Sequence, residues 1–336
     1  MTLRVAINGF GRIGKTFLRA VLQDKNNLEI GAINLGPTKN PEQTALLFAY
    51  DSLMGTFPGV VEYKNQTLII NGKTITLLYE ADATKLPWKA LAIDWVIESS
   101  GKYTTKAKAS AHLVAGCAKV LITAPAEDDD ITIIPGINDH AYNAQKHAIV
   151  SLGSCTTNAL APLIKVITEN FTLESAVVTT VHAYTNDQNL LDGAHNDPRR
   201  ARAAALNIIP TKTGADKVIT KLYPELIGKI AAIALRVPVP AVSIIDMSFT
   251  TEQNLTKEMV NSAFKKAAES NLKNILCYTT LPLVSSDFKG HPASAIFDAE
   301  LTLVTQKTAK IFAWYDNEFA YSLRLKEFLI AIDKTK

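Results

Sequence analysis

Cys155 stands where an apolar run gives way to small polar residues. The run covers residues 148–150, the segment SLGSCTTNALAP covers residues 151–162, and a helix-like spacing of leucine and isoleucine follows. A cysteine where a strand turns into a helix meets unpaired backbone N–H groups and the positive end of the helix dipole, and both favour the thiolate. A cysteine that only fills a core needs no polar flanks. The segment therefore predicts a nucleophilic thiol at a strand–helix junction.

His182 is the second residue whose type and position fit such chemistry. It follows the strand-like residues 176–181 and opens the segment HAYTND. An imidazole within reach of Cys155 either holds it as a thiolate–imidazolium pair or takes its proton during the reaction. A lone histidine at a strand end more often makes a structural hydrogen bond. Together with the cysteine segment it predicts a catalytic pair, and both alternatives for the proton stay open.

The chain opens with a turn that suits a dinucleotide. Residues 3–8 are apolar and strand-like, the sequence GFGRIG follows at residues 9–14, and a helical spacing of apolar residues comes next. In this order of strand, turn and helix, glycines let the backbone approach a pyrophosphate that lies on the helix N-terminus. The residues expected to bind the cofactor there are Gly9, Gly11, Arg12, Ile13 and Gly14.

The next strand-like segment, residues 28–34, is expected to end beside the adenosine ribose. A NAD-binding unit usually carries an acidic residue there, about 20 residues after the glycines. This chain has Asn34 and Leu35 instead, so no carboxylate would repel a 2′-phosphate, and Thr38 and Lys39 could donate hydrogen bonds to one. The cofactor is therefore predicted to be NADP or NAD, with NADP slightly favoured. Lys39 could equally be a solvated loop residue.

Strand-like and helical runs alternate in the first half of the chain. Residues 94–98, 119–123 and 148–151 are strand-like, and residues 106–115 are amphipathic. This alternation predicts a parallel, doubly wound sheet. A dinucleotide lies at the carboxyl ends of such strands, so three residues that follow strands are expected to contact it. They are Ser100, Gly101 and Thr123.

In the second half, strand-like runs follow one another with one clear helix among them, at residues 256–271. Strands without intervening helices suggest an antiparallel sheet. The predicted fold class is an α/β Rossmann-type dinucleotide-binding domain over residues 1–153 and an α+β catalytic domain with a mostly antiparallel sheet over residues 154–317. A C-terminal helix over residues 318–336 is expected to pack back on the first domain.

Composition narrows the classes of function. The 336 residues carry a formal net charge of +3, which is too small to imply nucleic acid as a partner. Three widely spaced cysteines fit neither a disulfide framework nor a zinc site, so no metal is expected. No apolar run approaches about 18 residues, which argues against a membrane span and for a cytoplasmic protein. His112, His140 and His147 have no partner pattern and are interpreted as surface or packing residues.

Seven segments together resemble one family. They are INGFGRIGK, SCTTN, HAYTND, PRRARAAALNIIPTKTGA, LRVPVP, LVSSDF and WYDNE. In this order and spacing the chain resembles phosphorylating glyceraldehyde-3-phosphate dehydrogenase over nearly its whole length. The segments SCTTN and HAYTND together are specific for this family, whereas the glycine turn alone would not be.

The resemblance implies a mechanism and its partners. Cys155 would attack the aldehyde of glyceraldehyde 3-phosphate, and His182 would accept the proton, with the backbone N–H of Cys155 as an oxyanion donor. Inorganic phosphate would then attack the thioester to give 1,3-bisphosphoglycerate. Asn317 resembles the residue that fixes the nicotinamide carboxamide. The family also implies a homo-oligomer, in particular a homotetramer.

Two anion sites follow from the same resemblance. Thr185 and Arg236 would hold the C3 phosphate of the substrate. Hydroxyl groups and N–H groups bind dianions without a competing carboxylate. The site for the attacking phosphate would consist of Ser154, Thr156, Thr213 and Gly214. The cluster Arg199, Arg200 and Arg202 is interpreted as ion pairs and a subunit contact, and Asp187 as a residue that orders this loop.

Departures from the family pattern concern mainly the coenzyme. Leu35 replaces the usual ribose-binding aspartate, and Gly193-Ala194 stands where NAD-specific members commonly have Leu-Pro. Both changes indicate that the coenzyme is NADP, or that the protein uses both NADP and NAD. Ala159 replaces a second cysteine, Lys212 interrupts a threonine run, and nothing in the sequence explains Phe319-Ala320 in place of Trp-Gly.

Two other functions fit part of the same pattern. Erythrose-4-phosphate dehydrogenase shares the fold and the cysteine, but Thr185 after His182 favours the three-carbon substrate. A non-catalytic dinucleotide-binding interaction protein would have lost the nucleophile or the base, and both Cys155 and His182 are present.

Overall fold

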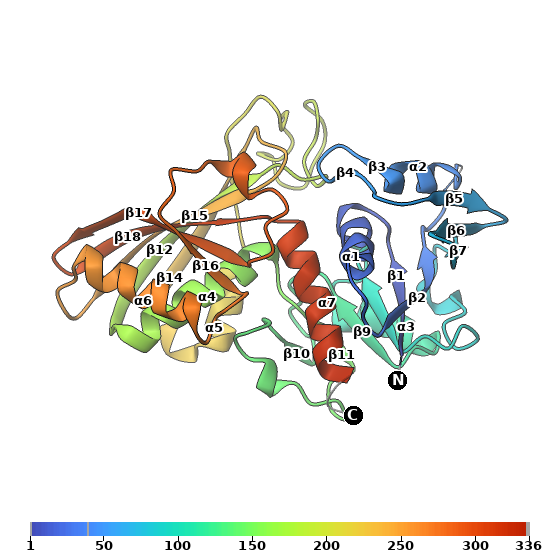
Figure 1. Ribbon diagram of the computed structural model, residues 1–336, viewed down its shortest axis with the longest axis horizontal. Helices are drawn as coiled ribbons and strands as arrows, with labels where there is room; N and C mark the ends of the chain where they lie inside the picture. Colours follow the sequence, from blue (N-terminus) through green and yellow to red (C-terminus); the bar gives the residue numbers. More distant parts are fainter. Residues whose placement is uncertain (1, 39, 334–336) are drawn as a thin grey trace. The chain divides into compact units, whose positions relative to one another are not determined.

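The computed structural model describes residues 2–38 and 40–333, and its contacts divide the chain into two compact units. The first unit comprises Met1–Ile133, Asp139–Gly153 and Ser322–Lys336, and the second comprises Ile134–Asn138 and Ser154–Tyr321. Figure 1 follows the chain from blue to red through both. The change of unit at residue 154 comes immediately before Cys155.

The first unit is built on a nine-stranded sheet with the strand order β10-β11-β9-β8-β1-β2-β7-β6-β5. Strands β10 to β7 pair in parallel, which confirms the expected Rossmann-type domain. Strands β5 to β7 continue it as an antiparallel meander, for which the sequence pattern predicted no element. The strands are β1 (Leu3–Asn8), β2 (Leu28–Asn34), β5 (Val61–Lys64), β6 (Thr67–Ile70), β7 (Lys73–Leu78), β8 (Trp95–Glu98), β9 (Lys119–Ile122), β10 (Ile131–Thr132) and β11 (Ile149–Ser151).

The turn between β1 and the first helix requires glycine. Gly9 has φ +95°, and a Cβ there would lie 2.5 Å from the backbone of Ser100. A Cβ on Gly14 would lie 2.4 Å from the carbonyl oxygen of Gly9. Only glycine at these positions lets the end of β1, the end of β8 and the first helix approach one another so closely. The other elements of this region are α1 (Arg12–Leu22), α2 (Gln43–Ala49), β3 (Tyr50–Asp51), β4 (Gly55–Thr56), η1 (Ala83–Lys85), α3 (Lys106–Val114) and η2 (Asp139–Ala141).

The C-terminal helix α7 (Phe319–Asp333) returns to the first unit with the residues from Ser322 onward. Lys326 Nζ donates to the carbonyl oxygen of Ala20 at 2.9 Å, although this side chain is almost fully buried. Phe328 packs edge-on against Trp95 with ring centroids 5.9 Å apart. A buried ammonium needs such partners, and here they attach the helix to α1.

The second unit contains a seven-stranded sheet with the order β13-β14-β12-β15-β18-β17-β16. Four strand pairs are antiparallel and two are parallel, so the expected mostly antiparallel sheet is confirmed. Its elements are α4 (Cys155–Asn170), β12 (Leu173–Ala183), β13 (Ile209–Thr211), α5 (Ala215–Leu222), η3 (Pro224–Leu226), β14 (Ile230–Val237), β15 (Ser243–Thr251), α6 (Lys257–Glu269), β16 (Leu276–Thr279), η4 (Ser285–Phe288), β17 (Ala295–Thr305) and β18 (Thr308–Tyr315).

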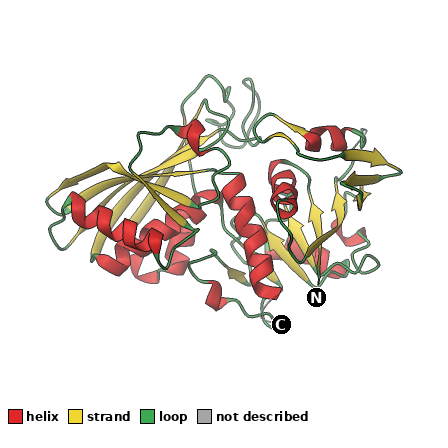
Figure 2. Cartoon of the chain, in the orientation of Figure 1, coloured by secondary structure: helices red, strands yellow, loops and turns green. Residues whose placement is uncertain are grey.

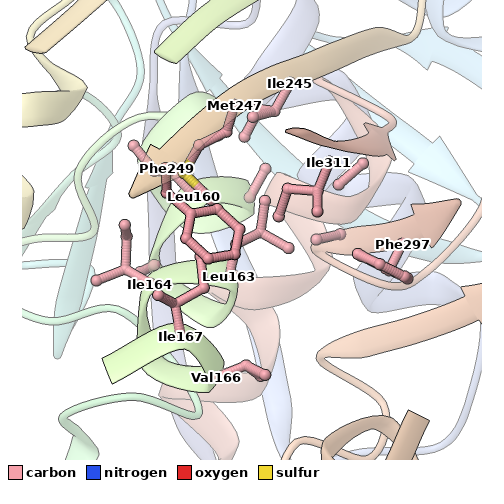
Figure 3. Close-up of a cluster of buried hydrophobic side chains, with 14 of the residues drawn as sticks. Leu160, Leu163, Ile164, Val166, Ile167, Ile245, Met247, Phe249, Phe297 and Ile311 are labelled. Atoms are coloured by element: carbon pink, nitrogen blue, oxygen red, sulfur yellow. The ribbon is translucent and has the colours of Figure 1, made fainter. Parts of the chain in front are cut away.

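Helices α4, α5 and α6 cover one face of this sheet (Figure 2). Helix α4 contributes an almost continuous buried stripe to the core (Figure 3). The stripe faces inward-pointing residues of β15, β17 and β18, because alternate residues of a strand share one side. The residues labelled in Figure 3 are Leu160, Leu163, Ile164, Val166, Ile167, Ile245, Met247, Phe249, Phe297 and Ile311. This packing holds the first turn of α4, and with it Cys155, on a rigid support.

Candidate active site

Cys155 is the first residue of α4, as the sequence predicts. Ser154 caps the helix because its Oγ accepts a hydrogen bond from the backbone N–H of Thr157 at 3.1 Å. The Cys155 Sγ lies 3.4 Å from Nε2 of His182, which the strand β12 supplies. The two residues that were expected to form a pair are therefore within hydrogen-bonding distance.

The register of β12 and β14 places Arg236 beside His182. His182 Nδ1 lies 2.6 Å from the carbonyl oxygen of Ala183, which can only accept, and the N–H groups of the nearby Arg236 Nη1 have the Ala183 carbonyl and the Thr185 hydroxyl as acceptors, so we assign the proton to Nδ1. The other nitrogen, Nε2, then faces the sulfur with a lone pair. Arg236 Nη1 donates to the same Ala183 carbonyl at 3.0 Å and lies 2.9 Å from Nδ1. The local bonds thus select the tautomer in which Nε2 can accept a proton from Cys155.

Arg236 is also placed to meet an anion. Its Nη1 lies 3.4 Å from the hydroxyl of Thr185, and its buried Nε has no hydrogen-bond partner among the described residues. A guanidinium N–H that is buried without an acceptor is costly unless a ligand supplies one. The structure brings together the two residues that were expected to hold the C3 phosphate.

Charges and burial decide the protonation of the pair. Burial raises the pKa of the Cys155 thiol, while the Arg236 charge and the hydroxyl and backbone N–H of Thr156 act in the opposite direction. Burial lowers the pKa of His182 to about 3, and the Arg236 charge adds to this. Both shifts favour a neutral thiol beside a neutral imidazole. Of the two alternatives for the proton, the unliganded site thus favours the one in which His182 takes it during the reaction.

The lowered pKa of His182 predicts a pH-dependent contribution to stability. In the unfolded chain this imidazole binds a proton below pH 6.5, whereas in the folded chain it does so only near pH 3. The contribution is thus complete above pH 6.5 and is lost as pH falls toward 3. Between pH 7 and pH 5 we expect the stability advantage of wild type over His182→Gln to shrink by about 2 kcal/mol. Denaturant unfolding of both proteins at one concentration measures this, and a constant difference would contradict the buried neutral imidazole.

Tyr315 belongs to this site, and the sequence analysis missed it. Its hydroxyl lies 3.0 Å from the hydroxyl of Thr156 and 2.7 Å from that of Thr180. Its ring packs edge-on against His182 with centroids 5.9 Å apart. Burial raises the pKa of this phenol well above its ordinary value, so it stays neutral. The segment WYDNE contains the residue, but no sequence pattern indicates that β18 ends beside α4.

The other residues expected to bind phosphate occupy helix starts. Thr156 is buried in the first turn of α4 with its hydroxyl bonded to Tyr315. Gly214 is the N-cap of α5 and gives no side-chain cap, and the hydroxyl of Thr213 accepts from the N–H of Ala215 at 3.3 Å. N–H groups at such helix starts suit an anion.

Ion pairs order the arginine-rich loop, as expected. Arg200 pairs with Asp187 and also donates from Nε to the hydroxyl of Thr211 at 2.9 Å. Arg202 pairs with Asp192 at 2.7 Å. No contact in the structure bears on the expected subunit role of this cluster. Asn317 is buried close to His182, because the hydroxyl of Ser243 donates to Asn317 Oδ1 at 3.4 Å and accepts from the backbone N–H of Ala183 at 3.1 Å.

A cavity of about 420 Å³ lies at the carboxyl ends of β1, β2 and β8. This is the edge at which a doubly wound sheet binds dinucleotides. Helix α1 begins there at Arg12 with no side-chain cap and no acidic residue in its first turn, so its N-terminus can receive a pyrophosphate. The groups present therefore fit a dinucleotide. Of the predicted cofactor residues, those that line the cavity are Gly9, Gly11, Asn34, Leu35, Thr38 and Ser100.

The remaining predicted cofactor residues lie in adjoining turns or outside the described residues. Arg12 and Ile13 open α1, where Arg12 pairs with Asp51. Gly101 has φ +73° after Ser100, and the Thr123 N–H donates to the carbonyl oxygen of Glu98 at 3.0 Å. Gly14 lies in the first turn of α1. Lys39, proposed as a phosphate donor, lies outside the described residues.

Within residues 2–38 and 40–333, the structure contains no cluster of three or more His, Cys, Asp or Glu side chains that could hold a metal ion. No helix in the described part of the chain has the length and apolar character needed to cross a bilayer.

Known proteins match the chain over its whole length. Residues 3–106 match the family model for the NAD binding domain of glyceraldehyde 3-phosphate dehydrogenase, and residues 154–317 match the model for its C-terminal domain. A glyceraldehyde-3-phosphate dehydrogenase of Streptomyces coelicolor is 49% identical over 335 residues, which is 99% of each chain. Glyceraldehyde-3-phosphate dehydrogenase 2 of Bacillus subtilis is 45% identical over 331 residues, covering 98% of this chain and 96% of its own.

Proposed function

Because the chain belongs to the glyceraldehyde 3-phosphate dehydrogenase family, we propose that Cys155 and His182 carry out the aldehyde oxidation for which its relatives are named. The protein is an oxidoreductase that uses a nicotinamide dinucleotide and acts on glyceraldehyde 3-phosphate. The observation that supports these two residues is the distance of 3.4 Å between the sulfur and an imidazole nitrogen that is free to accept a proton.

The chemistry follows from that arrangement. His182 Nε2 takes the thiol proton as Cys155 Sγ attacks the aldehyde carbon, and it returns the proton to the oxygen, which gives a thiohemiacetal. The backbone N–H of Cys155, at the start of α4, stabilises the oxygen while it is negative. The bound dinucleotide supplies a hydride acceptor. As the hydroxyl proton returns to Nε2, Cys155 is left with a thioester, which inorganic phosphate cleaves to give 1,3-bisphosphoglycerate.

Two anion sites serve the two phosphates in this proposal. Thr185 and Arg236 hold the C3 phosphate, supported by the contact between them and the unpaired Nε of Arg236. Ser154, Thr156, Thr213 and Gly214 form the site for the attacking phosphate. Burial keeps the imidazole of His182 neutral by lowering its pKa, and the charged guanidinium of Arg236 adds to this effect, so that Nε2 can accept a proton.

The coenzyme preference is a separate proposal. Leu35 lines the cavity where an acidic residue would contact a ribose, and a leucine at this position places no negative charge against a 2′-phosphate. We infer dual use of NADP and NAD with NADP slightly preferred, and Asn317 as the residue that fixes the nicotinamide carboxamide.

Leu35→Asp tests the coenzyme proposal. The new carboxylate repels a 2′-phosphate and can accept hydrogen bonds from ribose hydroxyls, so kcat/KM for NADP should fall about 100-fold while that for NAD stays level or rises. Leu35→Asn is the matched control, because it has the same shape without the charge and should change the ratio less than about threefold. A wild-type protein that strongly prefers NAD would contradict the proposal before any substitution is made.

The assembly, the domain roles and the location complete the proposal. We propose that residues 1–153 with the helix over 318–336 bind the coenzyme, that residues 154–317 bind substrate, and that the chain is a cytoplasmic homotetramer. The relatives reported above are named as glyceraldehyde-3-phosphate dehydrogenases, and neither is named for erythrose 4-phosphate or for a non-catalytic binding role.

A further inference from the structure

Glu98 is a buried carboxylate behind the dinucleotide cavity, at the end of β8. It is 2% exposed, and each of its oxygens accepts two hydrogen bonds. Oε1 accepts from the N–H of Ser100 at 2.8 Å and from its hydroxyl at 2.5 Å. Oε2 accepts from Asn8 Nδ2 at 2.6 Å and faces His112 Nε2 at 3.0 Å. Four donors occupy the four acceptor positions of an ionised carboxylate.

Trp88 fixes the proton of His112. The indole N–H can only donate, and it lies 3.1 Å from Nδ1 of His112. Nδ1 must therefore be the acceptor, and Nε2 must carry the proton that reaches Glu98. Both His112 and Trp88 are fully buried, so these bonds are shielded from bulk solvent. His112 is thus more than the surface or packing residue that the sequence suggested.

The chain of bonds continues from Glu98 to the rim of the cavity. Asn8 uses Nδ2 on Glu98, so its Oδ1 accepts from Asn34 Nδ2 at 2.7 Å. Asn34 Nδ2 also donates to the carbonyl oxygen of Glu80 at 2.9 Å, and its Oδ1 accepts from the N–H of Glu80 at 3.0 Å and of Gly36 at 3.3 Å. All four hydrogen-bonding positions of the Asn34 amide are occupied, which leaves none for a ligand.

Gly36 and Glu80 form part of the cavity wall, as do Ser100 and Tyr103. Tyr103 packs on the ring of His112 with centroids 5.3 Å apart. Apart from the bond to Trp88, the contacts that leave the Glu98 and His112 pair run through Asn8, Ser100 and Tyr103, which all line this cavity. The direction of each bond is set by the one before it, beginning from an indole that can only donate.

We propose that Glu98 and His112 are positioning residues that fix the adenosine-side wall of the dinucleotide cavity, and that Asn34 transmits this order without contacting the coenzyme. The inference rests on the dinucleotide role of the cavity. The adenosine side is the relevant one because the bonds end at Gly36 and Glu80, beyond the end of β2 where the ribose is expected.

Glu98→Gln tests the proposal because glutamine keeps the shape of the side chain but replaces one acceptor oxygen with an NH₂ group, which can only donate. Wherever the new NH₂ group points, it meets donors: the N–H of Ser100 on one side, or Asn8 Nδ2 and His112 Nε2 on the other. His112 cannot change its tautomer to help, because Trp88 occupies Nδ1. We expect the dissociation constants of NAD and of ADP-ribose to rise by the same factor of about 10, measured by titration, with kcat at saturating coenzyme within about twofold.

Two controls separate positioning from general damage. Alkylation of Cys155 in the absence of coenzyme reports on the second unit and should stay within about twofold of wild type. Thr132→Val removes another hydrogen bond in the first unit, from a hydroxyl to Asp129 Oδ2 at 2.6 Å on β10, and should leave both dissociation constants unchanged. If Glu98→Gln does not fold, Asn34→Asp decides, because its second oxygen would face the acceptor oxygens of Asn8 and Glu80.

The outcomes are distinct. Unchanged affinity in a folded Glu98→Gln protein, or in Asn34→Asp where that variant decides, would overturn the proposal. A weaker affinity for NAD with normal affinity for ADP-ribose would also overturn it, since the wall would then lie elsewhere. A wild-type protein that binds neither molecule would instead refute the coenzyme role of the cavity itself.

Discussion

Replacing Cys155 by serine lowers kcat for the oxidation of glyceraldehyde 3-phosphate by at least about 10⁴-fold. A serine hydroxyl beside a neutral imidazole is a far weaker nucleophile than a thiol, and an oxygen ester is a poorer acyl donor to phosphate than a thioester. Steady-state rates with saturating coenzyme and phosphate measure the loss.

Cys277→Ser is the matched control for this substitution. Cys277 is a partly exposed cysteine in the same unit, on β16, and is expected to change kcat less than about twofold. Coenzyme affinity should be normal in both variants. A Cys155→Ser protein with more than a few per cent of wild-type activity would remove the nucleophile from the proposed mechanism.

His182→Asn should lower kcat by about 10² to 10⁴, because no group at Nε2 then accepts the thiol proton. Burial raises the pKa of the Cys155 thiol, so little thiolate exists at pH 7 without a base. Alkylation of Cys155 by iodoacetamide should therefore slow in the variant at pH 7. The difference should narrow as pH rises toward the pKa of the thiol, where the proton leaves to solvent.

His291→Asn provides the comparison for the loss of a buried imidazole. His291 is a partly buried histidine in the same unit, and burial also lowers its pKa. Its replacement should leave both kcat and the alkylation profile as in wild type. An alkylation profile of His182→Asn that runs parallel to that of wild type at every pH would exclude His182 as the base.

Local pattern was sufficient for the first two strands of the dinucleotide domain and for the helix that presents Cys155. The limits of β1 and β2 agree with the predicted residues 3–8 and 28–34, because apolar strands between glycine, asparagine and charged residues have clear ends. Helix α4 begins at Cys155 because Ser154 can cap it. The mostly antiparallel second sheet was also predicted from its succession of strands.

Long-range register could not be predicted from the sequence. The parallel pairing of β12 with β14 places Arg236 beside His182, where its charge adds to the effect of burial in lowering the pKa of the imidazole. The same holds for Tyr315, which reaches Thr156 from β18, and for Glu98 and His112, which meet behind the cavity. Each pair is 14 or more residues apart, and no periodicity or motif relates one member to the other.

Resemblance to the family supplied roles for residues whose chemistry the pattern left open. The structure supports some of them, as with Thr185 and Arg236, and suggests a different role for Asn34. Asparagine after a strand fits either contact with ribose or support of a loop. Only the saturation of its four hydrogen-bonding positions distinguishes the two.

The central claim is that the substrate becomes a thioester on Cys155, and trapping this species tests it most directly. Enzyme mixed with coenzyme and glyceraldehyde 3-phosphate, but without inorganic phosphate, should be quenched in acid and analysed by peptide mass spectrometry. The predicted result is a phosphoglyceroyl group on the peptide that contains Cys155, formed within one turnover and removed when phosphate is added. Turnover without any adduct, or an adduct on Cys277 alone, would contradict the claim.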